Sequence, residues 1–534
     1  MRRFHSYGPI NNKLHYYAPR EELLNRAYTQ LLGENPSEGG HYITVWAPRQ
    51  TGKTWVMQQI LFRLKKENKF DVLKINLESL KDKKEPGDII NTIARKIGEG
   101  LNKTFKGIDN QDKFQEMFKK GVLDKPLILI LDEFDALIEE GINALVGAFR
   151  NIYIQRMDEM NKPTGQKTYL LHGAVLIGVR SVLGFESQTG SPFNVQRSLH
   201  VPNLTYEEVE GMFQWYQKES GQEIEPEVIK KLYEETRGQP GLTCWLGELL
   251  TEGIENYPND ITKPIRMADF ENIYGLAINL LPNNNILNII SKVGKDPYRE
   301  TVLTLFNPAK PFKFHFDKKE INFLYMNGVI EPEIIPGDTS YIRFASPLVQ
   351  KRLFNYFSGE IFSEMGQLVD SFFHVKEVIS PDHIDIPMVL QLYQAYLDKN
   401  KTWLFKNAPR RSDMRVYEAV YHFNLYTYLD ELLRGKGVRV YPEFPTGNGK
   451  IDLIIRYKNI TYGIELKSFT DQAGYYESLE RAARYGNQLQ LRDIYLVSFV
   501  ESMDEASKKK YETVYRDPQA NVTVHPIFLQ TGSP

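Results

Sequence analysis

The chain has 534 residues, and its 66 Lys and Arg nearly balance its 68 Asp and Glu, which gives a formal net charge of −2. This length suggests about three domains, and the charge balance excludes a uniformly basic coat for nucleic acid while leaving local basic patches open. The single cysteine, Cys244, excludes an internal disulfide framework and cysteine-based zinc sites, and it favours a cytoplasmic protein. The N-terminus lacks the apolar region of a signal peptide, and no apolar run is long enough to span a membrane.

The first 200 residues alternate apolar strands with helical segments. Strands are predicted at 42–47, 70–77, 126–131 and 170–179, and helices at 53–66 and 86–101. Strands that alternate with helices predict a mostly parallel sheet that is covered on both faces.

The segment between the first strand and the first of these helices reads APRQTGKT over residues 47–54, close to the phosphate-binding pattern GxxxxGK[ST]. In such a loop, backbone N–H groups surround phosphates at a helix N-terminus. The glycine permits the close approach, the lysine would reach the β- and γ-phosphates, and the last threonine would hold Mg²⁺. Ala47 replaces the first glycine of the pattern. We expect ATP to be bound by Gln50, Thr51, Gly52, Lys53 and Thr54.

A second nucleotide signature follows the buried strand 126–131, which ends in Asp132 and Glu133. Asp132 would bind Mg²⁺ through water, and Glu133 would polarise the attacking water. An acidic helix start would place the same two residues here, so the assignment depends on its pairing with the phosphate loop. Arg180, after the last predicted strand, is a candidate sensor of the γ-phosphate, and a surface arginine is the alternative.

The next part of the chain is helical and then changes character. Helices are predicted at 207–220 and 226–237, with a stop and restart at Gly238–Gln239–Pro240–Gly241. Residues 265–360 then give a helix, a hairpin and a helix that starts at Ser346. This is the order of elements in a winged helix.

Residues 15–250 resemble the AAA-like and STAND-like P-loop ATPases of archaea and bacteria. The resemblance rests on Tyr17, Arg20 and Glu21, on APRQTGKT, on LILILDEFD, and on the Gly-Gln-Pro turn. It implies that Tyr17, Arg20 and Pro240 contact the adenine nucleotide. It also implies an oligomer, whose size no residue determines, and a winged helix that packs against the nucleotide domain more often than it binds DNA.

The last part of the chain forms a second α/β unit. A helix is predicted at 414–433, strands at 438–444, 451–457 and 461–466, a helix at 475–489, and strands at 493–500 and 521–529.

Asp452 on one of these strands and Glu465-Leu466-Lys467 on the next carry a second chemistry. Adjacent strands can place Asp452 beside Glu465, and the alternation along a strand puts Glu465 and Lys467 on one face. Two carboxylates and the Leu466 carbonyl suit Mg²⁺, with Mn²⁺ as an alternative ion. Lys467 would orient or deprotonate the attacking water. This arrangement predicts phosphodiester hydrolysis.

The pattern resembles that of the PD-(D/E)XK nucleases, and residues 410–534 are similar in order to Holliday-junction resolvases and restriction-type nucleases. The resemblance implies that Glu418 completes the metal site, with Glu443 as its rival. In the Gln-x-x-x-Tyr motif of many family members, Tyr485 fits, but Arg481 replaces the glutamine. We expect this departure to leave the metal site untouched and to change the DNA contacts of the helix.

Two basic clusters could meet a phosphate backbone, and solvated surface faces are the alternative: 410–411 with 415, and 508–510. The sequence therefore predicts a multidomain α/β protein. Its predicted parts are a P-loop ATPase core (1–200), a helical lid (201–260), a winged helix (261–360), a helical connector (361–405) and a restriction-endonuclease-like domain (406–534).

By resemblance, the predicted function is that of an ATP-dependent or ATP-regulated, Mg²⁺-dependent nuclease that cleaves DNA, in defence against phage or mobile elements. One alternative is a nucleotide-switched scaffold that binds nucleic acid through an inactive nuclease fold. The other is an effector that cleaves RNA. The activating trigger, the cut site, and endonuclease versus exonuclease action stay open.

Overall fold

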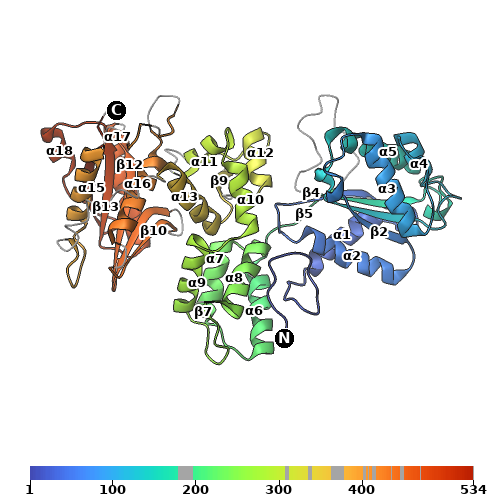
Figure 1. Cartoon of the computed structure of the whole chain (residues 1–534), viewed down its shortest axis with the longest axis horizontal. Helices are drawn as coiled ribbons and strands as arrows, with labels where there is room; N and C mark the ends of the chain where they lie inside the picture. Colours follow the sequence, from blue (N-terminus) through green and yellow to red (C-terminus); the bar gives the residue numbers. More distant parts are fainter. Residues whose placement is uncertain are drawn as a thin grey trace. The chain divides into compact units, whose positions relative to one another are not determined.

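The computed structural model divides the chain into two compact units, which we describe separately (Figure 1). The first comprises 1–277, 283–285 and 315–330, and the second comprises 278–282, 286–314 and 331–534. The structure describes all residues except 179–196, 256, 307–311, 335–339, 363–377, 401–403, 407, 412–415, 434–435, 446–449, 470 and 533–534, and it leaves out the side chains of 443–445 and 450. The five predicted domain boundaries stay predictions.

The first unit contains a five-stranded sheet in the order β2-β3-β4-β1-β5, in which all neighbouring strands are parallel. Strands β3 and β4 are buried along their whole length, because helices cover both faces of the sheet. The mostly parallel sheet is thus confirmed, and β5 is an addition. The strands are β1 (Tyr42–Trp46), β2 (Asp71–Asn76), β3 (Leu127–Asp132), β4 (Leu171–Gly178) and β5 (Arg197–His200).

Two hydrophobic clusters hold the helices against the two faces of this sheet. On one face lie α1 (Glu21–Leu32) and α2 (Lys53–Glu67), and on the other lie α3 (Pro86–Leu101), α4 (Gln111–Glu116) and α5 (Glu139–Asp158) (Figure 1). Helix α3 illustrates how the helices pack on the sheet, because its buried isoleucines recur at spacings of three and four residues and so form one apolar stripe. Three short 3₁₀ turns complete the layer: η1 (Glu78–Leu80), η2 (Phe134–Ala136) and η3 (Thr164–Gln166).

A helical lid follows β5. Helix α6 starts with a capping box in which the side chains of Thr205 and Glu208 each accept a hydrogen bond from the other residue's backbone N–H. Farther along, α8 begins with Pro240 at its first position, where proline is favoured. The elements in the predicted lid range are α6 (Tyr206–Ser220), α7 (Pro226–Thr236), α8 (Pro240–Glu252), β6 (Gly253–Ile254) and β7 (Tyr257–Pro258). Helix α9 (Met267–Asn279) follows this range.

Helix α12 (Lys319–Met326) comes from the region with the winged-helix order, yet it belongs to the first unit. The Trp46 ring, at the end of β1, lies 6.1 Å from that of Tyr325 and 6.5 Å from that of Phe316. The helix therefore packs beside the strand that leads into the phosphate loop.

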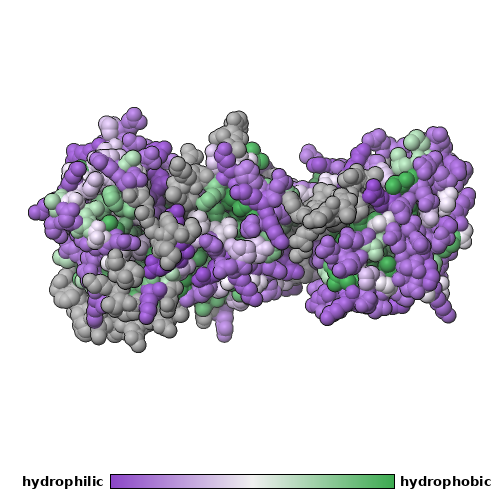
Figure 2. Space-filling model, turned by 90° about the horizontal axis from the view of Figure 1, so that it is seen from above, coloured by the Kyte–Doolittle hydropathy of each residue, from purple (hydrophilic) through white to green (hydrophobic). Residues whose placement is uncertain are grey.

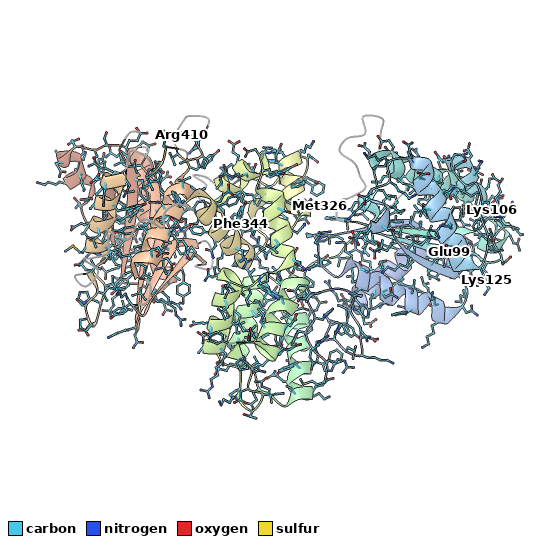
Figure 3. The ribbon with its side chains drawn as sticks, viewed as in Figure 1. Glu99, Lys106, Lys125, Met326, Phe344 and Arg410 are labelled. Atoms are coloured by element: carbon cyan, nitrogen blue, oxygen red, sulfur yellow. The ribbon has the colours of Figure 1, made fainter. Side chains whose placement is uncertain are left out.

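The rest of that region lies mostly in the second unit: α10 (Asn284–Val293), α11 (Tyr298–Phe306), β8 (Ile330–Glu333), β9 (Tyr341–Phe344) and α13 (Pro347–Ile361). Strands β8 and β9 pair as a two-stranded sheet. The Ser346 hydroxyl accepts a hydrogen bond from Val349 N at 3.2 Å, as the predicted N-cap requires. Phe344 packs on Phe306 at a ring distance of 4.9 Å (Figure 3). The order of elements agrees with the prediction, and the winged-helix class stays a prediction.

The second unit also contains a six-stranded mixed sheet in the order β10-β11-β12-β13-β15-β14, in which β12, β13 and β15 are parallel. Helix α17 packs on it through a cluster that includes Leu479, Ala482 and Ala483. The elements are α15 (Ile386–Asn400), α16 (Glu418–Leu433), β10 (Val438–Pro445), β11 (Lys450–Tyr457), β12 (Ile460–Ser468), α17 (Gln472–Gln488), β13 (Asp493–Val500), α18 (Glu505–Tyr511), β14 (Tyr515–Arg516) and β15 (Thr523–Gln530).

Helix α16 begins four residues later than predicted, at Glu418 rather than Met414. The reason is that Val416 forms a β-bridge with Arg410, so its backbone is extended. The view in Figure 2 shows a mostly hydrophilic surface with scattered apolar residues. Within the described residues, no helix is both long and apolar enough to cross a bilayer.

Candidate functional site

The phosphate loop lies between β1 and α2, and its backbone is bent by two left-handed residues. Gly52 has a φ of 88° and Gln50 a φ of 58°. A Cβ on Gly52 would meet no atom within 4 Å, so the positive φ, not crowding, is what requires glycine there. Thr51 Oγ1 donates to Pro48 O at 2.9 Å and braces the turn. The loop thus ends at a helix N-terminus, where backbone N–H groups can receive phosphate.

Lys53 lies folded into this loop. Its Nζ donates to the carbonyls of Ala47 at 2.9 Å and Pro48 at 2.8 Å. Burial lowers the pKa of Lys53 to about 8, although the nearby carboxylates of Glu133, Asp135 and Asp132 oppose the shift. A cation held at such a cost in desolvation is suited to an anionic ligand, since phosphate oxygens would be stronger partners than two carbonyls.

Asp132 ends the buried strand β3 and is 2% exposed. Thr54 Oγ1 donates to its Oδ1 at 3.3 Å, so the two residues predicted to hold Mg²⁺ lie together. Lys74, on the neighbouring strand β2, places its Nζ 3.2 Å from Asp132 Oδ2. The sequence reasoning missed Lys74, whose only signal was a charged residue inside an apolar strand.

Glu133, the predicted water-polarising residue, has a φ of 56° and turns the chain sharply away from β3. Burial and the charges of Asp135 and Asp132 raise its pKa above the ordinary value for glutamate. A carboxylate with a raised pKa is a better proton acceptor, which fits a role beside an attacking water.

The lid is attached to the phosphate loop by hydrogen bonds to two backbone carbonyls of the loop. Gly241 N, in the first turn of α8, donates to Gln50 O at 3.1 Å, and Gln239 Nε2 donates to Arg49 O at 3.0 Å. Pro240 lies between them at the first position of the helix. The lid turn therefore lies against the loop that would hold the phosphates.

The three other residues predicted to contact the nucleotide differ in their surroundings. The Tyr17 ring lies 5.5 Å from Trp55 and 5.8 Å from Trp215. The Arg20 guanidinium binds the first turn of the lid and the chain before it: Nε pairs with Glu208 Oε1 at 3.0 Å, and Nη1 donates to Pro202 O at 2.8 Å. Arg180 lies outside the described residues.

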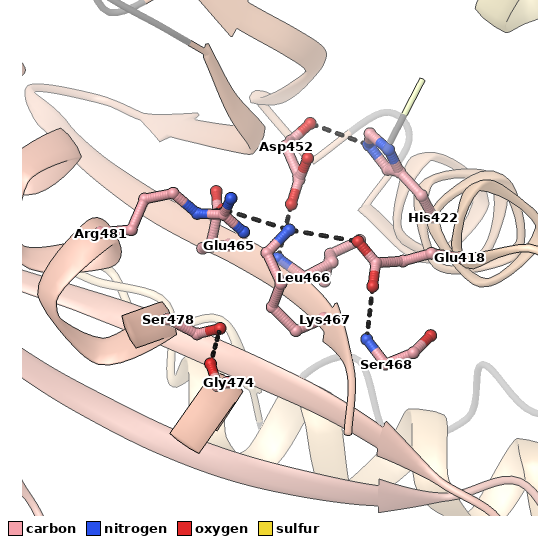
Figure 4. Close-up of polar contacts among 10 residues, drawn as sticks. All are labelled: Glu418, His422, Asp452, Glu465, Leu466, Lys467, Ser468, Gly474, Ser478 and Arg481. Atoms are coloured by element: carbon pink, nitrogen blue, oxygen red, sulfur yellow. Dashed lines mark hydrogen bonds and ion pairs between the residues drawn. The ribbon is translucent and has the colours of Figure 1, made fainter. Parts of the chain in front are cut away.

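A second group of charged side chains lies in the mixed sheet (Figure 4). Asp452 on β11 and Glu465 on β12 are 3% and 2% exposed. Asp452 Oδ2 accepts a hydrogen bond from Leu466 N at 2.6 Å, which brings the two strands' carboxylates together. His422 on α16 places its Nε2 2.9 Å from the Asp452 carbonyl oxygen. The buried imidazole therefore anchors the backbone of this strand, a role that its position on a helix face did not reveal.

Lys467 lies at the centre of the group. Its Nζ lies 3.5 Å from Glu465 Oε1 and 3.1 Å from Glu418 Oε1. The second oxygen of Glu418 accepts a hydrogen bond from Ser468 N at 2.6 Å. Burial alone would lower the pKa of Lys467, but the surrounding carboxylates of Glu418, Glu465 and Asp452 raise it above its ordinary value. The lysine is held charged and in one orientation.

Arg481 on α17 departs from what the sequence predicted. Its Nε lies 3.4 Å from Glu465 Oε1, so the residue in the glutamine position of the motif does touch the predicted metal site. The cause is tertiary, since the α17 helix packs on the sheet beside β12. Tyr485 is partly buried against the core of the same sheet.

These residues offer an incomplete set of metal ligands. Glu465 Oε2 is buried and has no hydrogen-bond partner, and a buried unpartnered carboxylate oxygen fits a cation. Burial, together with the charge of Asp452, raises the pKa of Glu465, while Lys467 and Arg481 oppose the shift. Among the described residues, no group of three or more His, Cys, Asp or Glu is arranged to hold a metal ion. The expected third carboxylate, Glu418, is bonded to Lys467 and Ser468 instead, and the side chain of Glu443 is not described.

A cavity of about 1040 Å³ opens beside this group, entirely within the second unit. Its wall also includes Glu300, whose Oε1 accepts a hydrogen bond from Tyr417 at 2.7 Å. One predicted basic cluster lines it, except for Arg415, which is not described. The charged side chains in the lining are of both signs: Arg410, Arg411, Lys467, Arg481 and Arg484, with Glu300, Glu418, Glu477, Glu480 and Glu501.

The parallel sheet, the loop at the helix N-terminus and the Asp–Glu pair after a buried strand define the first unit's core as a P-loop ATPase domain. Residues 37–161 match the family described as "AAA domain". The matched residues include the phosphate loop and the end of β3. The chain thus contains an AAA-type ATP-binding domain.

Three solved structures of low identity are similar to this chain. The ORC1 protein of Aeropyrum pernix, solved in complex with DNA, is 15% identical, covering 65% of this chain and 94% of its own, with a TM-score of 0.34. A Walker-type ATPase of Pyrococcus abyssi is 13% identical, covering 66% and 99%, with a TM-score of 0.43. The RuvB Holliday junction branch migration motor of Thermotoga maritima is 14% identical, covering 61% and 92%, with a TM-score of 0.34. These values carry no statement about substrate. No curated protein matches the sequence significantly.

Proposed function

We propose that this protein is an ATP-dependent or ATP-regulated nuclease that uses Mg²⁺ and cleaves DNA. The observation that carries the proposal is the group of Asp452, Glu465 and Lys467, at the edge of a cavity that Lys467 lines. Asp452 is joined to the Glu465–Lys467 strand through Leu466 N at 2.6 Å, and Lys467 Nζ lies 3.5 Å from Glu465 Oε1. A buried set of carboxylates with one charged lysine has little structural use, because each buried charge costs free energy.

Each residue of the group has a distinct part in the proposed reaction. Asp452, Glu465 and the Leu466 carbonyl would hold Mg²⁺, which when bound makes a water molecule more acidic and stabilises charge on the phosphate. Lys467, held by Glu418 at 3.1 Å, would orient the attacking water and stabilise the transition state. His422 and Leu466 N keep Asp452 in place.

The substrate is proposed to enter through the cavity, where Arg410, Arg411 and Arg484 would meet the phosphate backbone. DNA rather than RNA is proposed from the PD-(D/E)XK resemblance, as are a winged helix in the middle region and defence against phage or mobile elements. The AAA-type domain supports control by ATP and an oligomeric assembly.

Two alternatives stay open. The first is a nucleotide-switched scaffold, in which the mixed sheet binds nucleic acid without cutting it. The bonding of both Glu418 oxygens favours it, because it leaves fewer carboxylate oxygens for metal. The second is an RNA-cleaving effector, since arginines that meet a phosphate backbone do not distinguish the two nucleic acids.

The test is a cleavage assay on labelled linear, nicked and branched DNA and on RNA, with Mg²⁺ and with or without ATP. Asp452→Asn should lower the rate of cleavage at least about 100-fold. Lys53→Ala should abolish the increase in cleavage that ATP produces. Glu505→Gln is the matched control, because this carboxylate is exposed on α18, away from the group. Cleavage that survives both Asp452→Asn and Lys53→Ala unchanged would refute the proposal, and cleavage of RNA alone would favour the effector.

A further inference from the structure

Arg481 occupies a position in the nuclease group that neither its motif nor the predicted metal site explains. Its side chain is 29% exposed and lines the cavity. Its Nε lies 3.4 Å from Oε1 of the buried Glu465. Lys467 Nζ approaches the same oxygen at 3.5 Å (Figure 4). One oxygen of Glu465 is therefore shared by two cations.

Among the described residues, the contacts of Glu465 leave the side of its Oε2 for a metal ion. Oε1 faces Lys467 and Arg481, whereas Oε2 is buried without a partner. An ion bound by Oε2 could also be bound by Asp452. The Asp452 carboxylate is held nearby because it accepts a hydrogen bond from the backbone N–H of Leu466, the residue after Glu465. An ion on the Oε1 side would have to displace the arginine.

Glu418 is the carboxylate that the sequence predicted as a further metal ligand, but both of its oxygens already accept hydrogen bonds. Lys467 Nζ donates to Oε1 at 3.1 Å and Ser468 N to Oε2 at 2.6 Å. Such charge-assisted bonds are strong. Glu418 therefore positions Lys467 instead of providing a ligand for a second ion.

The balance of charge leads to the same result. With all groups ionised, Asp452, Glu465 and Glu418 carry three negative charges, and Lys467 and Arg481 carry two positive ones. One divalent cation and one phosphodiester together neutralise the remainder. A second divalent cation would leave two positive charges uncompensated in a largely buried group, which is costly.

We propose that Arg481 takes the place of a second metal ion, so that the nuclease group takes a single divalent cation at Asp452 and Glu465. This rests on the nuclease function proposed above. Because Nε makes the ion pair, the terminal Nη groups keep their donors for a phosphate oxygen, and a guanidinium matches phosphate with two parallel hydrogen bonds. Arg481 then supplies positive charge to the substrate without a metal.

The test counts bound ions in the full-length protein without ATP, in complex with a DNA duplex whose phosphorothioate linkages keep the negative charge and resist cleavage, because the charge balance includes one phosphodiester. Mn²⁺ is titrated and measured by electron paramagnetic resonance, and the count in Asp452→Asn is subtracted, which removes ions bound elsewhere. Wild type should show one ion. Arg481→Gln should show two, because the loss of the cation leaves room and negative charge for the second. Arg481→Lys is the matched control and should stay at one ion, but should cleave DNA more slowly, because an ammonium cannot form the two parallel bonds.

The outcomes separate this inference from the function on which it rests. If wild type and Asp452→Asn bind the same number of ions, there is no metal at this group, and the proposed nuclease function fails. If wild type binds two ions that Asp452→Asn removes, the metal site stands and the role of Arg481 is refuted. Arg481→Gln that stays at one ion also refutes it. If Arg481→Gln does not fold, a wild-type count of two still refutes the inference, and Arg481→Lys that cleaves DNA as fast as wild type refutes the role of the guanidinium.

Discussion

At the scale of single residues, each of the two candidate sites contains a buried carboxylate that is paired with neighbouring side chains. Asp132 is buried with Thr54 and Lys74 as its partners, and Glu465 is buried with Lys467 and Arg481. Elsewhere the surroundings of buried titratable groups differ: the buried Glu235 pairs with Lys231 at 2.9 Å, whereas burial keeps His172 neutral. Strongly perturbed groups collect at functional sites.

His172 is a buried group of the neutral kind, and it predicts a loss of stability in acid. Its Nδ1 lies 2.9 Å from Thr164 Oγ1 and its Nε2 3.2 Å from Leu32 O. Burial, aided by the charge of Arg156, lowers its pKa to about 3. Because the folded-state pKa lies below the unfolded one, the unfolded chain binds the proton more readily, so stability is complete above about pH 6.5 and is lost as the pH falls.

From pH 7.5 to 5.5, this one group should reduce the free energy of unfolding of the first unit by about 1.4 kcal/mol. Denaturant titrations at the two pH values measure the change. In His172→Gln the pH-dependent loss should be smaller by that amount, since other histidines still titrate. Equal losses in the two proteins would contradict the assignment.

At the scale of elements, both sites lie where strands end and a helix from elsewhere in the chain closes over them. The turn at the start of α8 lies against the phosphate loop, and α16 and α17 bring Glu418 and Arg481 to β12. Strand ends leave side chains that are not enclosed by the sheet's own packing, which allows a second element to complete a site. The contact between the lid and the loop can be tested directly.

Gly241→Ala should disturb that contact. A Cβ at position 241 would lie 2.7 Å from Gln50 Cβ, too close for either atom without a shift of the loop. We expect ATP affinity to fall about tenfold, the equivalent of a strain of about 1.4 kcal/mol, as measured by calorimetric titration.

Gly211→Ala on α6 is the matched control, because a Cβ there meets no atom within 4 Å. It should keep ATP affinity and stabilise the helix by up to about 1 kcal/mol. An unchanged affinity in Gly241→Ala would show that the lid turn does not hold the loop.

At the scale of the whole molecule, the chain is grouped into two compact units with separate candidate sites. ATP would bind only the first unit, and ligand binding stabilises the unit that binds it. We therefore expect two thermal transitions by differential scanning calorimetry. ATP at 100 times its Kd should stabilise the transition of the first unit by about 2.7 kcal/mol, and a smaller shift of the second transition would measure the coupling through which ATP controls the nuclease.

Lys53→Ala should remove that ATP-dependent shift, since its Nζ belongs to the phosphate loop. A second transition that ATP does not shift at all would count against control of the second unit by ATP. A single transition would mean that the two units unfold together.

The sequence by itself determined the features that depend on neighbours along the chain. The alternating strands and helices predicted the parallel sheet, and the order of Gly52, Lys53 and Thr54 predicted the phosphate loop, because that loop is built from consecutive backbone groups. The start of α16 was misplaced, because the extended backbone of Val416 is stabilised by a bridge to Arg410 that no local pattern shows.

Only the tertiary structure decided which charges meet. Lys74 reaches Asp132 from another strand, His422 reaches the Asp452 carbonyl from α16, and Arg481 reaches Glu465 from α17. These partners are separated by 16 to 58 positions in the sequence, and spacing along one element does not encode the packing of two. The identity of the chemical groups was thus readable from the sequence. Their pairing depended on how helices pack against the sheets, because the free energy of a buried charge is set by the atoms around it.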